Sequence, residues 1–161
     1  MADIKIKGLA ELHQALQGLP GNIERNVLRG ALRAAGNVIA AAARANVDRL
    51  AHPTGVLKKS IRVSMRVRSR AGWVNANVKA GDKVAYYAHM VEFGTARHWI
   101  KPKNRKSLFF AGMAREVVDH PGARARPFLR PAFDSQAATA MEAMAEYIRN
   151  RLPKEIRKAG P

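Results

Sequence analysis

The stretch that decides the fold is "SIRVSMRVR", residues 60–68. Apolar and polar residues alternate in it, and such alternation is typical of a half-buried β-strand. The apolar face comprises Ile61, Val63, Met65 and Val67, and the other face comprises Arg62, Ser64, Arg66 and Arg68. After the turn "SRAG", the stretch "WVNANVKA" returns with the same alternation, so the sequence predicts an antiparallel hairpin with one apolar face. The arginines either protect the strand against edge-to-edge pairing or contact a ligand.

A long helix is expected before this hairpin. Residues 22–50 are rich in alanine and repeat apolar residues at intervals of three and four, as a core-facing helix does. Arg25, Arg29 and Arg33 lie four residues apart on it. They form either a solvated ridge or a docking ridge.

A second helix is expected near the end of the chain. Pro131 suits its first position, and Pro153 is expected to end it. Its predicted inward stripe consists of Phe133, Ala137, Ala140, Met141, Met144, Ile148 and Leu152.

The segment between the hairpin and the last helix is expected to add strands. "HWIKP" and "SLFFAG" flank the polar turn "KPKNRK", and "AREVVDH" has a further strand pattern. The expected fold class is therefore α+β: an antiparallel β-sheet of hairpins, with about four to five strands, packed by a long N-terminal helix and a C-terminal helix. No repeat or linker interrupts the chain, so we expect residues 1–161 to form a single domain, with 153–161 as a frayed tail.

The charge balance indicates an acidic partner. Twenty-nine Lys and Arg stand against twelve Asp and Glu, which leaves a net charge of +17. Such a chain is expected to meet nucleic acid, an anionic membrane or an acidic protein surface. The absence of cysteine suits a reducing cytosol, and the first residues do not have the pattern of a signal peptide. No apolar run is long enough to span a bilayer, so we expect a soluble, intracellular protein without a membrane partner.

The stretch "YAHMVEFGTARHWI", residues 87–100, raises the question of an enzyme. His89, Glu92 and His98 suggest metal ligands or an acid/base pair, but no H-E-x-x-H spacing occurs. No P-loop, G-x-S-x-G elbow or dinucleotide-binding motif is present either. We therefore expect no catalytic residue, no metal and no cofactor, with a metal-dependent enzyme as a distant alternative. Glu92 is expected to neutralise an arginine and to help hold a backbone turn at Gly94.

A basic nucleic-acid-binding accessory protein is the nearer alternative. Residues 97–130 carry nine Lys and Arg against two acidic residues, a net charge of +7. Trp99, Phe109, Phe110 and Phe128 are interleaved with them, as stacking residues would be, although aromatic residues in strands more often belong to the core. No helix-turn-helix, zinc finger or RNP motif occurs, so only nonspecific contact with double-stranded DNA is supported.

The order of several motifs carries a family resemblance. "LKKSI" is followed by "YYAHMVEFGT", then by "WIKPKNRKSLFF", and finally by "HPGARARPFLRPAFD". The blocks "VEFGT", residues 91–95, and "ARPFLRPAFD", residues 125–134, carry most of it. This series resembles the tail-completion (neck, head–tail joining) proteins of long-tailed double-stranded DNA bacteriophages, of the minor tail protein Z type. The resemblance extends over roughly residues 5 to 150.

The resemblance implies a non-enzymatic virion protein, assembled in the cytoplasm of a bacterial host. It implies a homo-oligomeric ring, with six subunits as the expectation, between the tail tube or terminator proteins and the head connector proteins. A tail terminator ring is a related alternative. Five arginines are expected to contact the neighbouring ring, the connector or packaged DNA: Arg62, Arg66, Arg68, Arg124 and Arg126. The residues expected to form the structural motif are Glu92, Phe93, Gly94, Thr95, Pro127, Phe128, Arg130 and Pro131.

Overall fold

The computed structural model describes residues 21–50, 55–68, 73–103, 106–110 and 112–159. Its helices are α2 (Gly21–Asp48), α3 (Gly55–Ser60), α4 (Ala88–Phe93) and α5 (Leu129–Ala159). Its strands are β1 (Arg62–Arg68), β2 (Trp73–Lys79), β3 (His98–Ile100), β4 (Leu108–Phe110), β5 (Met113–Arg115) and β6 (Val118–His120). The predicted fold class is confirmed: the described chain has two long helices, α2 and α5, and the antiparallel strand pairs come between them in the sequence.

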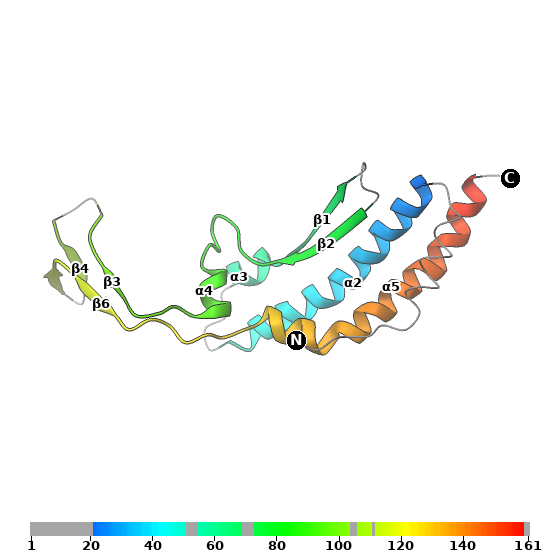
Figure 1. The fold of residues 1–161 in the computed structure, drawn as a ribbon. Helices are drawn as coiled ribbons and strands as arrows, with labels where there is room; N and C mark the ends of the chain where they lie inside the picture. Colours follow the sequence, from blue (N-terminus) through cyan, green and yellow to red (C-terminus); the bar gives the residue numbers. More distant parts are fainter. Residues whose placement is uncertain (1–20, 51–54, 69–72, 104–105, 111, 160–161) are drawn as a thin grey trace.

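The two long helices pack against each other and form the body of the molecule (Figure 1). Val27 and Ala31 of α2 are fully buried against Met144 and Ile148 of α5. Small residues permit this close approach, because a Cβ built on Gly30 would lie within 2.1 Å of the Tyr147 hydroxyl oxygen. The alanine-rich sequence of α2 therefore serves helix–helix contact as well as helix propensity.

The hairpin predicted from "SIRVSMRVR" is present and lies along α2 (Figure 1). β1 and β2 pair antiparallel, from Arg62 opposite Lys79 to Arg68 opposite Trp73. Gly36 of α2 faces Val63, where a Cβ would lie 2.9 Å from a valine methyl carbon. Below the hairpin, the larger core cluster joins α2, α3, α4 and the start of α5. Its buried members are Ala40, Ala43, Val47, Leu57, Ile61, Ala88, Phe128 and Ala132.

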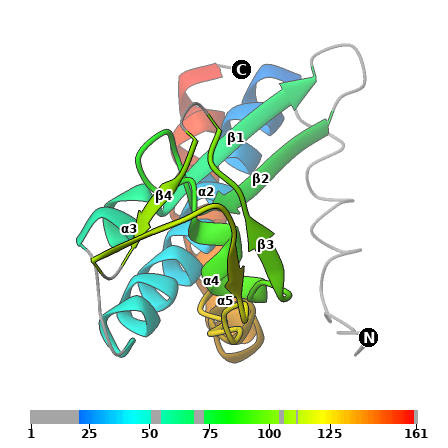
Figure 2. The same ribbon diagram turned by 90° about the vertical axis from the view of Figure 1, so that its left-hand side faces the viewer.

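The described residues between 95 and 126 (95–103, 106–110 and 112–126) form an arm that projects from the body (Figure 1). The expected strands around "KPKNRK" are present, but they do not pair with each other: β3 pairs with β6, and β4 pairs with β5. The stretch "AREVVDH" contributes to two short strands rather than one. The arm is thus a pair of nested two-stranded ribbons, and it faces the viewer in Figure 2.

Three expectations for the last helix are wrong: its first residue, its end and the inward position of Phe133. α5 begins at Leu129, so Pro131 is its third residue, and it continues through Pro153 to Ala159, into the segment expected to fray. An ion pair between Arg151 and Glu155, 2.6 Å apart, spans Pro153 on consecutive turns and supports the helix there. Phe133 is half exposed instead of pointing inward, and its neighbour Ala132 is buried in its place.

The continuation of α5 predicts the effect of replacing Pro153. Proline in a helix interior removes a backbone hydrogen bond and clashes with the preceding turn. Pro153→Ala should therefore raise the free energy of unfolding by about 1–3 kcal/mol, measured by denaturant unfolding followed by far-UV circular dichroism. Pro131→Ala is the matched control and should not raise the free energy of unfolding, because a proline in the first turn interrupts no hydrogen bond within the helix and the alanine N–H there gains no partner within it. Unchanged stability of Pro153→Ala would mean that the helix ends before this residue in solution.

Candidate functional site

The carboxylate of Glu92 holds the start of α5. Glu92 lies on α4 and is nearly buried, at 7% exposure. Its Oε2 accepts hydrogen bonds from the backbone N–H groups of Phe128 and Leu129, at 2.8 and 2.9 Å. Its Oε1 accepts a third from the N–H of Arg130, at 3.0 Å. The positive end of the α5 dipole also favours a negative charge at this position.

These contacts account for every backbone donor at the start of α5. The first N–H groups of a helix have no partner within it and need one elsewhere. Glu92 takes three of them, and the next residue, Pro131, has no N–H to satisfy. The blocks "VEFGT" and "ARPFLRPAFD" are therefore two halves of one interaction.

The predicted role of Glu92 as the partner of an arginine is wrong. Among the described residues, Glu92 forms no ion pair, and its oxygens are used by backbone N–H groups instead. Arginines are abundant nearby in the sequence, but they are exposed, whereas Glu92 is buried next to a helix end. The unpaired N–H groups at the start of α5 therefore determine the partners of Glu92, and the number of arginines nearby in the sequence does not.

Phe128 also anchors the start of α5, through its contacts with the core. Its side chain is fully buried, and its carbonyl accepts a hydrogen bond from Asn46 Nδ2 of α2 at 3.0 Å. Phe93, also expected in the structural motif, has the opposite environment, with 80% exposure. Pro127, Arg130 and Pro131 are exposed as well.

Gly94 forms the corner between α4 and the arm. Its φ of 73° and ψ of −176° belong to a region that only glycine occupies readily. A Cβ at this position would lie 2.6 Å from the carbonyl oxygen of Ala123 on the returning chain. Gly94 is therefore required both for its conformation and for the close approach of the two chains.

The two chains of the arm are joined directly after this corner. Thr95 and Ala123 exchange backbone hydrogen bonds of 2.9 and 3.1 Å, and Thr95 Oγ1 accepts a further bond from the N–H of Ala123 at 2.9 Å. The N–H of Arg126 donates to the carbonyl of Val91 at 2.8 Å, which attaches the returning chain to α4. Gly122 permits this pairing, since a Cβ there would lie 2.2 Å from the carbonyl oxygen of Thr95.

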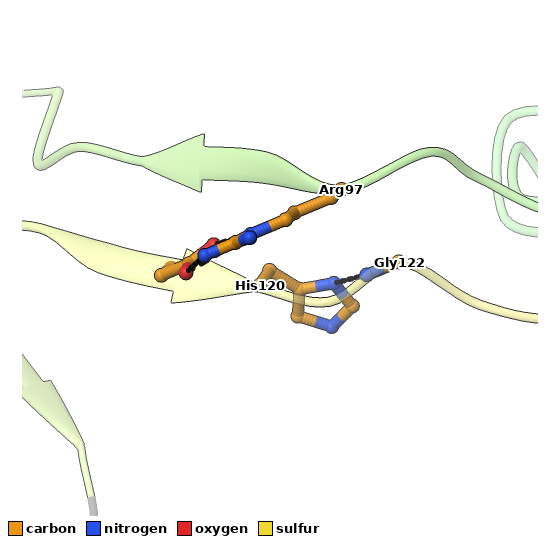
Figure 3. Close-up of polar contacts among 4 residues, drawn as sticks. Arg97, His120 and Gly122 are labelled. Carbon is orange, nitrogen blue, oxygen red and sulfur yellow. Dashed lines mark hydrogen bonds and ion pairs between the residues drawn. The ribbon is translucent and has the colours of Figure 1, made fainter.

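An ion pair braces the first ribbon of the arm. Nε of Arg97 donates to both carboxylate oxygens of Asp119, at 2.9 and 3.1 Å (Figure 3). These side-chain hydrogen bonds lower the pKa of Asp119 and raise the pKa of Arg97. The rings of His98 and His120 lie 5.0 Å apart in the same ribbon, and His120 Nδ1 accepts a bond from the N–H of Gly122 at 3.1 Å (Figure 3).

Large apolar side chains lie exposed on the arm and at its root. On the ribbons, Trp99 is 63% exposed and Phe109 is 80% exposed. At the root, a surface groove of about 780 Å³ is lined by residues of α4 and of the start of α5. The residues that line it include Phe93, Pro127, Leu129, Phe133 and Asp134. The region thus offers apolar surface suited to contact with another protein.

The structure places the five arginines expected to make interactions in two separate elements. Arg62 and Arg66 are exposed on β1, and Arg62 donates to the carbonyls of Ser60 and Gly81, so it also holds the ends of the hairpin. Arg68 belongs to β1, and its side chain lies outside the described part. Arg124 and Arg126 are exposed on the returning chain of the arm. They do not form one cluster with β1, which lies along α2 (Figure 1).

The histidines that suggested a metal site are not brought together. His89 lies on α4 and borders the groove, whereas His98 lies on the arm. In the part of the chain that the structure describes, no group of three or more His, Cys, Asp or Glu side chains could hold a metal ion. Within the same part, no helix has the length and apolar character needed to cross a membrane.

Two residues that complete the corner at Gly94 are absent from the motif predicted from the sequence. Gly122 and Ala123, which complete the root of the arm, were not selected. The dipeptide "PG" at 121–122 is a turn signal and pointed to them. The acceptor role of Glu92 had a signal as well, in the proline two residues after Leu129, which marks a helix start.

Comparison with known proteins identifies a family. The model of the HK97-gp10-like family, described as "Bacteriophage HK97-gp10, putative tail-component", matches residues 10–94, slightly more than half of the chain. The match includes α2, the β1–β2 hairpin and α4 with Glu92, and it ends at Gly94, where the arm begins. No curated protein and no solved structure matches the chain.

The cap formed by Glu92 predicts a cost for losing its charge. Glu92→Gln keeps the shape of the side chain but leaves one oxygen for three N–H donors. The free energy of unfolding should fall by about 1–3 kcal/mol, as measured by denaturant unfolding. Glu142→Gln, an exposed change on α5, should stay within about 0.5 kcal/mol of the original protein. Equal stability of the two variants would contradict the capping role.

The corner predicts that Gly94 cannot be replaced. Gly94→Ala adds strain at a positive φ and a clash with Ala123, so it should destabilise the chain by about 1–3 kcal/mol and disrupt the Thr95–Ala123 pair. Amide hydrogen exchange at Thr95 and Ala123 measures the second effect. Gly112→Ala is the matched control, because Gly112 also has a positive φ, of 79°, but no atom within 4 Å of the added Cβ. If amide hydrogen exchange at Thr95 and Ala123 increased equally in the two variants, backbone strain without the clash would explain the loss of protection.

Proposed function

The chain belongs to the HK97-gp10-like family of bacteriophage tail components, and from this premise we propose that it forms a ring at the top of the tail. The ring completes the tail and joins it to the head connector. In this role the chain is a structural virion protein and catalyses no reaction. Six subunits are proposed, in keeping with the resemblance described above.

The projecting arm is the observation that carries this proposal. It is fixed to the body by the Gly94 corner and by the Thr95–Ala123 pair, yet Trp99 and Phe109 on it are exposed. A rigidly held arm with exposed apolar side chains is suited to assembly with other proteins, because the contact buries surface that the single chain leaves in water.

The proposed partners come from the family resemblance and from the charge of the chain. Besides neighbouring subunits, they are the tail tube or terminator proteins on one side and the head connector proteins on the other. A net charge of +17 favours acidic partner surfaces and tolerates packaged double-stranded DNA in the passage. Arg66, Arg124 and Arg126 are exposed and available for these contacts. We propose residues 1–161 as one domain that acts as the ring subunit.

A basic nucleic-acid-binding protein is the second candidate. The arm favours it through Lys101, Lys103 and Lys106, which are exposed together with Trp99. This function requires high affinity for duplex DNA that falls steeply with salt concentration. It also requires that the isolated chain bind DNA without tails or heads.

The joining role predicts the effect of reversing charge on β1. Arg66→Glu combined with Arg68→Glu should block the joining of heads to tails and leave the fold intact, because the pair would repel acidic partner surfaces. Infectivity and electron microscopy of unjoined heads and tails measure the result, and circular dichroism checks the fold. The control is Arg149→Glu combined with Arg157→Glu, a matched reversal on exposed positions of α5. Normal infectivity of the β1 variant would refute a role for these arginines.

The position of the chain is tested by labelling. Gold-labelled protein should bind to one end of isolated tail tubes and to no other part of them. Binding along the whole tube, or to DNA alone, would refute the tail-top position.

A further inference from the structure

The arm of this chain leaves its own apolar side chains without cover. Each ribbon has two strands of three residues, which is too little structure to be stable in isolation. Trp99, Phe109 and Met113 are all more than half exposed. Among the described residues, the strands of the arm pack chiefly on each other and not on the helices. The arm therefore has the properties of a segment that is completed by another surface.

The chain also carries a surface that complements the arm in charge. Residues 95–126 contain eight Lys and Arg against two acidic residues. In contrast, residues 131–148 contain three acidic residues and no Lys or Arg, in a chain with a net charge of +17. These three, Asp134, Glu142 and Glu146, are exposed on α5. In the described part of the chain, none of them forms an ion pair.

The acidic surface adjoins the apolar groove. Asp134 lines the groove together with Phe93 and Phe133, which are 80% and 50% exposed. The groove and the acidic helix thus form one receiving surface, apolar at one end and acidic beyond it. The arm has the matching combination of exposed aromatic and basic side chains.

We propose that the arm of one subunit docks on this receiving surface of a second copy of the chain. Ala125, on the returning chain at the root of the arm, lines the groove of its own chain, but no residue of β3, β4, β5 or β6 does. These strands project away from the body (Figure 1), so Trp99 and Phe109 do not fill the groove of their own chain. The inference rests on the proposed function, since a ring needs a contact between copies, and it names the two surfaces that make that contact.

The dimensions agree with this contact. From Thr95 to Phe109, an extended chain spans at most about 50 Å. A helix of 28 residues, the length of α2, is about 42 Å long. The greatest possible reach of the arm is therefore comparable with the length of the body of a neighbouring subunit.

The arrangement of the two surfaces favours a ring. The donor surface and the receiving surface are different parts of the chain, so the contact is heterologous. Heterologous contacts produce closed rings when the rotation between subunits closes, and filaments when it does not. Duplex DNA is a poorer occupant of the arm, because phosphate contacts would leave Trp99, Phe109 and Met113 exposed to water.

The test is a charge swap between the two surfaces. In the arm variant, Lys101→Glu and Lys103→Glu make the arm less basic. In the receiving variant, Asp134→Lys and Glu142→Lys make α5 basic. The control variant carries Arg149→Glu and Arg157→Glu. Circular dichroism checks that each full-length variant is folded, and sedimentation over a concentration series measures self-association.

We expect the unmodified chain and the control to self-associate, and each of the two swap variants to associate at least about tenfold more weakly. Mixing the arm variant with the receiving variant should restore association, because the two carboxylates introduced in the arm then meet the two amines introduced on α5, and the unchanged arm of the receiving variant meets the unchanged α5 of the arm variant. The contact should weaken as salt rises to about 1 M, where the Debye length is about 3 Å.

Four results would overturn the inference. The first two are an unmodified chain that remains monomeric at every concentration and a swap variant that self-associates as strongly as the unmodified chain. The other two are a mixture of the two swap variants that fails to associate and an arm variant that assembles normally but no longer binds labelled duplex DNA. Normal assembly of the arm variant with loss of binding to tail ends would show that the arm serves another virion protein. That result refutes the arm-to-groove contact and leaves the proposed function standing. Normal self-association without binding to tail ends would refute the proposed function alone.

Discussion

The structure depends on one carboxylate at the start of a long helix. Glu92, from a helix of only six residues, supplies the acceptors that the first three donors of α5 lack, and Pro131 removes the need for a fourth. This places α4 against α5, and α4 in turn sets the position of Gly94 and of the arm. The longest helix, the core around Phe128 and the projecting surface are thus linked through a single side chain.

The body of the fold could be predicted from local pattern. Alternation in "SIRVSMRVR" and the alanine-rich periodicity before it identify the hairpin and α2, because each pattern repeats over many residues. The extension of α5 past Pro153 could not be predicted, since a proline usually ends a helix and the supporting Arg151–Glu155 pair depends on the helix being formed. The nested pairing of the arm was missed for a related reason: strands of three residues carry too little alternation to specify their partners.

The candidate site was predicted in part. Glu92, Gly94 and Phe128 were selected from their motifs, and the structure brings them together at one corner. The predicted partner of Glu92, an arginine, was wrong, because the sequence shows which residues are charged but not which backbone N–H groups the fold leaves without an acceptor. The exposure of Phe133 was also missed, since an apolar residue at a helical position is ordinarily assigned to the core. Phe133 lines the surface groove together with Phe93 and contributes to its apolar character.

The corner at Gly94 has a consequence for assembly geometry. Its backbone conformation and the tight approach of Ala123 leave the arm little freedom to swing about its root. The corner therefore favours one direction of the arm within the monomer. In an oligomer built through the arm, that direction would determine the rotation from each subunit to the next. The number of subunits would then depend on the backbone dihedral angles of Gly94 and not only on the contacts at the interface.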